Sequence, residues 1–177
     1  MKIAYQGIAG AFGHQACLAF CPDHEPVAKP SFGDVVNAVE TGETEFGMLP
    51  VENSAAGPVE EAQELLAGCL LHIASEHLLP IRMHLLGLPS ARLENIRTAV
   101  SHPMALRQCA QTLARLGLEA EEAPNTAVAA KALIDPTKAV LASEAAAEAY
   151  GLTILMRDVH DQEGNATRFV VLARDEK

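Results

Sequence analysis

The sequence predicts an α/β protein of two lobes, because short apolar strands alternate with helical segments along nearly all of its 177 residues. Such alternation is typical of mostly parallel sheets with helices on both faces. The segments form two groups that meet near Leu79-Pro80, and the last strand can return to the first group. We therefore expect one lobe of residues 1–79 plus 160–177 and a second of residues 80–159, with a ligand-binding cleft between them.

In the first group, each expected helix lies between two short strands. Ser31 is a favourable helix cap, and Phe32, Val35 and Val39 follow it at helical spacing. The pattern predicts strands at Lys2–Tyr5, Glu25–Lys29, Phe46–Val51 and Leu70–Leu79, and helices at Gln15–Phe20, Phe32–Glu40 and from about Pro58 to Leu66.

In the second group, the clearest element is a helix that begins at Pro103 and ends before Gly117. Leu106, Leu113 and Leu116 lie on one face of it, and proline suits the first helical position. Further strands are expected at Met83–Leu88, Thr98–Val100, Glu119–Ala123, Ala139–Leu141 and Thr153–Met156, and further helices at Ala127–Leu133 and Glu144–Tyr150. The last expected strand, Arg168–Leu172, returns to the first group.

Composition excludes several classes of protein. Hydrophobic residues make up 49% of the chain, which indicates a packed core. The net charge of −10 disfavours a nucleic-acid partner, since such a partner requires a basic face. No apolar run approaches the ~20 residues that span a bilayer, so we expect no membrane association. The chain enters a strand directly after Met1 without a signal-peptide pattern, so we expect a cytoplasmic protein.

The four cysteines are not expected to bind metal. Cys17 and Cys21 lie four residues apart with His14 and His24 nearby, but a second pair of ligands is missing. We expect reduced and mostly buried thiols, and no metal site.

Four junctions share one pattern, in which a strand ends, a small polar residue follows and a helix begins. A helix start presents free backbone N–H groups and the positive end of the helix dipole, and so favours anions. Each junction is alternatively an ordinary helix cap. The four are Asn53-Ser54, Ser101-His102, Asn125-Thr126 and Ser143-Glu144.

Thr167 and Arg168 place a hydroxyl and a guanidinium where the last loop becomes a strand. Arg168 is either a bidentate clamp for a carboxylate or a surface arginine paired with one of the acidic residues. Gly7, Gly10 and Gly13 do not form a dinucleotide-binding fingerprint, and no phosphate-binding lysine motif is present. We therefore expect no nucleotide.

Taken in order, these and neighbouring motifs resemble the catalytic domain of prephenate dehydratase. The matching residues cover nearly the whole chain. They are Tyr5-Gln6-Gly7, Gly10-Ala11-Phe12, Gly47–Ser54 with Gly57, Glu76-His77, His84–Gly87, Ser101-His102-Pro103, Ala105-Leu106, Gln108-Cys109, Asn125-Thr126-Ala127, Ala142-Ser143, Tyr150-Gly151-Leu152, Asn165 and Thr167-Arg168-Phe169.

The resemblance implies a fold similar to type II periplasmic binding proteins and the conversion of prephenate to phenylpyruvate, with loss of CO2 and water and without metal or organic cofactor. It makes Thr167 the catalytic group, a donor to the departing hydroxide. Residues expected to bind substrate are Asn53, Ser54, Ser101, His102, Thr126, Asn165, Arg168 and Phe169. Relatives suggest a homodimer.

The sequence departs from the family pattern in two ways. Ala11 and Gly13 stand where many members carry hydroxyl residues. Most members continue into a regulatory ACT domain, whereas this sequence ends at Lys177. We expect a catalytic domain without it, either naturally unregulated or separated from that domain. Two other functions remain open: arogenate dehydratase, and a carboxylate- or amino-acid-binding module without catalysis.

Overall fold

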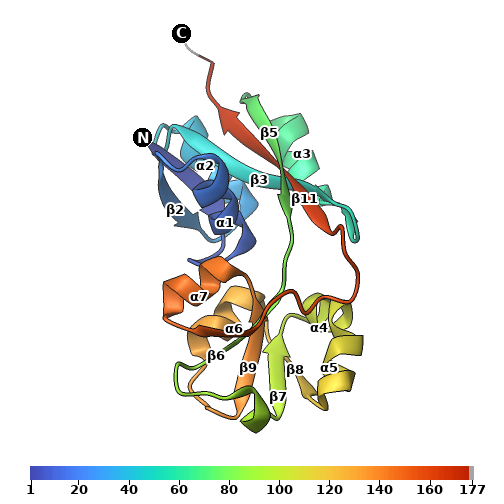
Figure 1. Ribbon diagram of the computed structural model, residues 1–177. Helices are drawn as coiled ribbons and strands as arrows, with labels where there is room; N and C mark the ends of the chain where they lie inside the picture. The colour runs from blue at the N-terminus through green and yellow to red at the C-terminus, as the bar shows by residue number, and fades with distance from the viewer. Residues whose placement is uncertain (176–177) are drawn as a thin grey trace. The chain divides into compact units, whose positions relative to one another are not determined.

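The computed structural model describes residues 1–175, and the chain divides into two compact units. Unit 1 comprises residues 1–8, 12–81 and the chain from Gly164 onward; unit 2 comprises Ala9–Ala11 and Arg82–Glu163. Figure 1 shows that β5 leads out of unit 1 and that the last strand, β11, returns to it. The short segment Ala9–Ala11 belongs to unit 2, which the sequence pattern did not predict.

Unit 1 is built on a sheet in the order β2-β1-β3-β11-β5, with the short β4 paired to β3. Its strands are β1 (Lys2–Gln6), β2 (Glu25–Lys29), β3 (Phe46–Asn53), β4 (Gly57–Pro58), β5 (His72–Pro80) and β11 (Ala166–Ala173). Its helices are α1 (Phe12–Phe20), α2 (Phe32–Glu40) and α3 (Glu60–Gly68).

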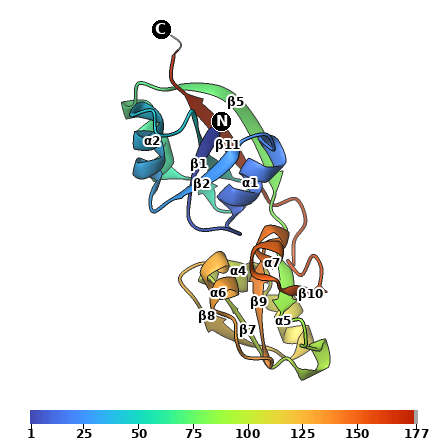
Figure 2. The same ribbon diagram turned by 90° about the vertical axis from the view of Figure 1, so that its left-hand side faces the viewer.

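Helices cover both faces of this sheet. Ala4, Leu49 and Val170 pack with apolar side chains of α2 and α3 in one buried cluster. The ring of Tyr5 points to the other face, since side chains alternate along a strand, and it stacks on His14 of α1. Figure 2 shows α1 and α2 on opposite sides of β1. As expected, Ser31 caps α2, with its hydroxyl accepting the Asp34 N–H at 3.1 Å.

Unit 2 is built on a sheet in the order β10-β6-β9-β7-β8. Its strands are β6 (His84–Gly87), β7 (Thr98–Ser101), β8 (Glu119–Glu122), β9 (Lys138–Ala142) and β10 (Thr153–Met156). Its helices are the 3₁₀ turn η1 (Leu93–Asn95), α4 (Pro103–Gln108), α5 (Ala110–Leu116), α6 (Thr126–Ala132) and α7 (Glu144–Tyr150). Leu86 and Val140 pack on one face against the alanines of α6 and α7.

Residues 9–11 are bound to α7 by two hydrogen bonds. The hydroxyl of Ser143 donates to the carbonyl of Gly10 at 2.7 Å, and the hydroxyl of Tyr150 donates to the carbonyl of Ala9 at 2.5 Å. Gly10 has a φ of +86°, and a Cβ added there would lie 2.7 Å from the Cα of Ala146. Only glycine therefore fits this position without moving backbone atoms.

Three expectations require correction. The sheets are mixed rather than mostly parallel, because β11 pairs antiparallel with β3 and β5, and β6 with β9 and β10. The helix expected over Pro103–Leu116 is interrupted at Cys109, whose φ and ψ of −113° and 7° are not helical. Pro58 does not open a helix; it lies in β4, and α3 begins at Glu60.

We predict that Gly10→Ala lowers the free energy of unfolding by about 2–4 kcal/mol, because backbone strain and an overlap with Ala146 add together. Gly57→Ala is the matched control, since Gly57 has a φ of +85° and no atom within 4 Å of an added Cβ. It should cost only about 1–2 kcal/mol from the left-handed backbone. Urea denaturation measures the loss of unfolding free energy in both variants. Equal losses would contradict the overlap with Ala146.

Candidate active site

The hydroxyl of Thr167 lies next to the amide of Asn53. The two residues are directly opposite each other in the β3–β11 pair, and Asn53 Nδ2 donates to Thr167 Oγ1 at 2.9 Å. Leu79 of β5 is the partner of Thr167 on its other side. Thr167 is only 8% exposed. Strand pairing thus brings together two residues that are 114 positions apart in the sequence.

The orientation of the Asn53 amide follows from its other hydrogen bonds. Asn53 Oδ1 accepts the backbone N–H groups of Ala55 and Ala56, at 2.9 and 2.8 Å. The oxygen must therefore face the turn, and the NH₂ group must face Thr167. Because Thr167 Oγ1 accepts this bond, the hydroxyl hydrogen of Thr167 remains available to an acceptor such as a ligand oxygen. Within residues 1–175 it has no acceptor of its own.

Ser54 and Asn165 connect the turn after β3 to the segment that leads into β11. The backbone N–H of Ser54 donates to the carbonyl of Ala166, and Ser54 Oγ accepts the Ala166 N–H, each at 2.9 Å. Ser54 Oγ also lies 3.3 Å from Asn165 Oδ1. The carbonyl of Asn165 accepts the Ile81 N–H at the end of β5. Asn53, Ser54, Asn165 and Thr167 therefore form one connected group in unit 1.

Arg168 contacts two carboxylates. Its guanidinium lies 3.4 Å from Glu52 of β3 and 3.2 Å from Glu76 of β5. Successive side chains of a strand point to opposite faces, so Arg168 and Thr167 are on opposite sides of β11. The sequence did not identify Glu52 or Glu76 as partners of Arg168, because local sequence patterns do not show which acidic residues lie on neighbouring strands.

Two predicted binding residues are buried. Phe169 is 2% exposed and is among the largest fully buried side chains of the protein. Ser101 is 0% exposed, and its hydroxyl donates to the carbonyl of Leu141 at 2.7 Å. Both side chains are engaged in the packing of their own unit in this structure.

The three junctions of unit 2 are helix caps. His102 Nδ1 accepts the Met104 N–H at the start of α4, and Asn125 Oδ1 accepts the Val128 N–H at the start of α6. Ser143 accepts the Ala146 N–H while donating to Gly10. Thr126 is the first residue of α6 rather than its cap. Ser101, His102 and Thr126 thus belong to unit 2, whereas Asn53, Ser54, Asn165 and Thr167 belong to unit 1.

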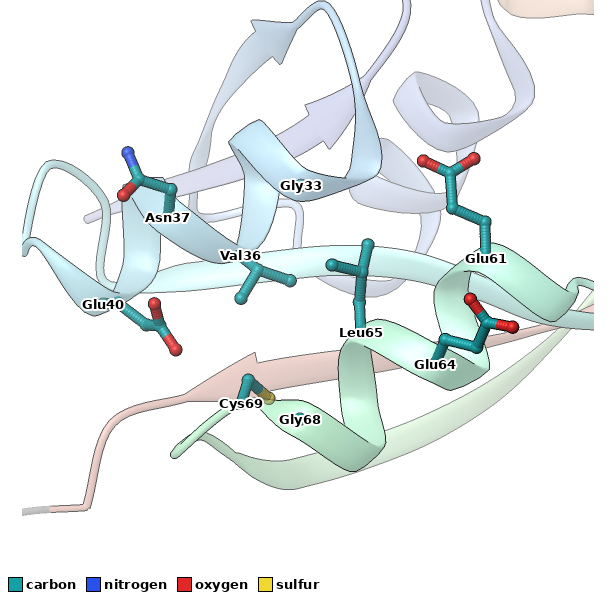
Figure 3. A pocket seen from close by; sticks show the side chains of 9 residues that line it. All are labelled: Gly33, Val36, Asn37, Glu40, Glu61, Glu64, Leu65, Gly68 and Cys69. Carbon is teal, nitrogen blue, oxygen red and sulfur yellow. The ribbon is translucent and has the colours of Figure 1, made fainter.

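A separate groove of about 450 Å³ lies between α2 and α3 in unit 1. Figure 3 shows Glu40, Glu61 and Glu64 around it, with Leu65 and Cys69 between the helices. None of the predicted site residues lines it. Its acidic rim does not favour the binding of an anion.

The described residues also bear on metals and membranes. Among residues 1–175, no three His, Cys, Asp or Glu side chains are arranged to hold a metal ion. In the same part of the chain, every helix is too short or too polar to cross a bilayer.

Burial raises the pKa of two cysteine thiols, that of Cys17 to about 12 and that of Cys109 to about 12. Both are neutral thiols at pH 7.

Comparison with known proteins shows the family to which the chain belongs. The sequence model of prephenate dehydratase matches residues 3–177. The chain belongs to the prephenate dehydratase family. The Arabidopsis thaliana protein named arogenate dehydratase/prephenate dehydratase 1, chloroplastic, is 38% identical over 178 residues. The match covers 99% of this chain and 45% of the Arabidopsis protein, so the chain spans about half the length of such relatives.

Solved structures agree on the fold of this family member. A structure described as a novel type of quorum quenching acylase, GqqA, matches with a TM-score of 0.93 and 34% identity, over 100% of this chain and 65% of that one. Prephenate dehydratase from Arthrobacter aurescens in complex with L-Phe matches with a TM-score of 0.90 and 25% identity, over 100% of this chain and 61% of that one. A putative methionine-binding lipoprotein from Bacillus subtilis, at 11% identity and a TM-score of 0.50 over 99% of this chain and 83% of that one, shares the fold alone. The expected similarity in fold to binding proteins is confirmed.

We predict that His102→Ala lowers the free energy of unfolding by about 1 kcal/mol, because the start of α4 loses its side-chain acceptor. His102→Asn should retain most of the stability, since asparagine is a strong helix cap. Chemical denaturation of the three proteins measures the difference. If His102→Asn destabilises the protein as much as His102→Ala does, the imidazole of His102 does not stabilise the protein by capping α4.

Proposed function

We propose that this chain is the catalytic part of a prephenate dehydratase, which converts prephenate to phenylpyruvate with loss of CO2 and water. The observation that supports this most directly is the Asn53–Thr167 hydrogen bond, in which the threonine oxygen accepts and its hydrogen is available. Family membership supplies the reaction. The local geometry offers a hydrogen-bond donor of the kind that the reaction requires.

The reaction requires a proton for the leaving hydroxide. When the ring carboxylate of prephenate departs as CO2, the electrons of its C–C bond enter the ring and the C–O bond of the ring hydroxyl breaks. The departing hydroxide and one proton form water. In our proposal, Thr167 donates its hydroxyl hydrogen to that oxygen as negative charge develops on it, and the proton is restored from solvent.

Threonine is a weak acid in water, so Thr167 needs electrostatic assistance. The N–H of Asn53 points at Thr167 Oγ1 and stabilises the negative charge that this oxygen gains as it gives up its hydrogen. Two backbone N–H groups hold the Asn53 amide in place before substrate binds. A donor that is already oriented does not have to reorganise during the reaction, which is the usual origin of such catalysis.

The remaining substrate contacts are part of the proposal. Ser54 and Asn165 carry polar groups beside Thr167 in unit 1. In unit 2, His102 Nε2 carries the hydrogen when Nδ1 accepts from Met104, so this nitrogen is a donor for a carboxylate. Thr126 adds a hydroxyl at the start of α6. For Ser101 and Phe169 we now propose packing, because both are buried.

We predict that Thr167→Val lowers kcat for prephenate by about 100- to 10,000-fold, because the proton donor is lost while the size of the side chain is kept. Thr167→Ser keeps a hydroxyl and should retain part of the activity. Phenylpyruvate formation, corrected for the spontaneous reaction, measures both. Full activity of Thr167→Val would remove Thr167 from the mechanism. Absence of turnover by the unaltered protein would remove the proposed function.

Prephenate is preferred over arogenate in this proposal, although relatives carry both names. Arogenate bears an amino group where prephenate bears a keto group, so an assay in which the two substrates compete decides the preference.

A cytoplasmic location and a homodimer remain predictions. Cell fractionation tests the first and light scattering the second.

Acylase activity is a second candidate, favoured by the likeness to the structure described as a quorum quenching acylase. Hydrolysis of an acyl group requires a nucleophile and a base, and Thr167 has an amide rather than a base beside it. Release of a free amine from an acylated quorum-sensing signal would support this activity. Its loss in Thr167→Val would place it at the same site.

A further inference from the structure

Arg168 bridges three neighbouring strands. Its Nη1 lies 3.2 Å from Glu76 Oε2 on β5, and its Nη2 lies 3.4 Å from Glu52 Oε2 on β3. Arg168 itself belongs to β11, the strand between them. The planar guanidinium presents donors in two directions and so suits a bridge between two carboxylates, whereas a lysine presents a single charged point.

The bridge lies beside an irregularity in the pairing of β3 with β11. Thr167 is paired with Asn53 and Arg168 with Glu52, but Phe169 is paired with Pro50, so the register shifts directly after Arg168. This leaves Val51 as an extra residue on β3, and such a bulge interrupts the ladder of hydrogen bonds. The Asn53–Thr167 pair therefore lies on the terminal side of a bulge, where an ion pair beside it can help to hold the ends of β3 and β11 in register.

The charge around Arg168 argues against substrate binding. One guanidinium faces two carboxylates, so the group carries a net charge of −1 when all three are ionised. A carboxylate of the substrate would meet more negative than positive charge there. Arg168 is also on the opposite side of β11 from Thr167.

We propose that Arg168, Glu52 and Glu76 form an ion-pair bridge that positions Thr167 opposite Asn53, an inference that rests on the proposed function of Thr167. Arg168 is then a positioning residue and does not contact substrate. Glu52 and Glu76 act through it. All three side chains are 40% to 54% exposed, so the bridge contributes little to global stability, and its effect is local to the ends of β3 and β11.

The experiment compares Glu76→Gln, Arg168→Gln and the double variant by their kcat and KM for prephenate. A shift of Thr167 by a fraction of an ångström is expected to lower kcat about tenfold in each single variant, with KM changed less than about twofold. The double variant should be no worse than either single variant, because both changes break the same bridge. Arg168→Lys should recover part of kcat.

Glu43→Gln is the matched control. Glu43 pairs with Lys29 at the surface of the same unit, and its side chain is 55% exposed, close to the 50% of Glu76. It should leave kcat and KM unchanged. A sharp rise of KM in Arg168→Gln, with KM unchanged or lowered in Glu76→Gln, would overturn the proposal and assign Arg168 to substrate binding.

Hydrogen exchange tests the bridge without turnover. Glu76→Gln and Arg168→Gln should both speed exchange of the backbone amides of residues 166–168 by about tenfold, and Glu43→Gln should not. If prephenate is not converted but exchange responds in this way, the proposed function fails while the bridge holds. If exchange at residues 166–168 is unchanged in both variants, the bridge is wrong whatever the activity.

Discussion

The antiparallel pairing of β3 with β11 is the constraint on which the proposed site depends. This pairing places Asn53 opposite Thr167 and joins the turn after β3 to the segment before β11 through Ser54. It also makes the C-terminal strand a central member of the sheet of unit 1. Asn53 and Thr167 therefore both lie in strands that are paired on both sides, and chemistry that depends on hydrogen-bond direction requires such rigidity.

The direction of one hydrogen bond determines what Thr167 can do. The turn at Ala55 and Ala56 engages the oxygen of Asn53, so the nitrogen faces Thr167, and the threonine hydrogen points elsewhere. In our proposal the two faces of β11 have separate roles. The Thr167 face presents the donor, and the ion pairs of Arg168 on the other face hold the strands in register. Adjacent residues of one motif can have different roles because strand side chains alternate.

The sequence predicted most elements because their signals are local. Ser31 before a helical pattern and Gly117 after one mark helix ends that the structure contains, and Gly117 has the expected left-handed φ of 68°. The antiparallel strands and the partners of Arg168 were missed, since they depend on contacts between distant segments. The attachment of Gly10 to Ser143 was missed for the same reason. The motif led to Thr167 as a candidate catalytic residue, but nothing in the sequence of either segment indicates its hydrogen bond to Asn53.

Asn53→Asp tests the central claim most directly. One oxygen of the aspartate can still accept from the turn, but the other faces Thr167 and accepts its hydrogen, so the donor is reversed and a negative charge is added. We predict a loss of kcat of about 100-fold or more, with a free energy of unfolding within about 1 kcal/mol of that of the unaltered protein. An Asn53→Asp protein that is equally stable and turns over prephenate at the original rate would contradict the account.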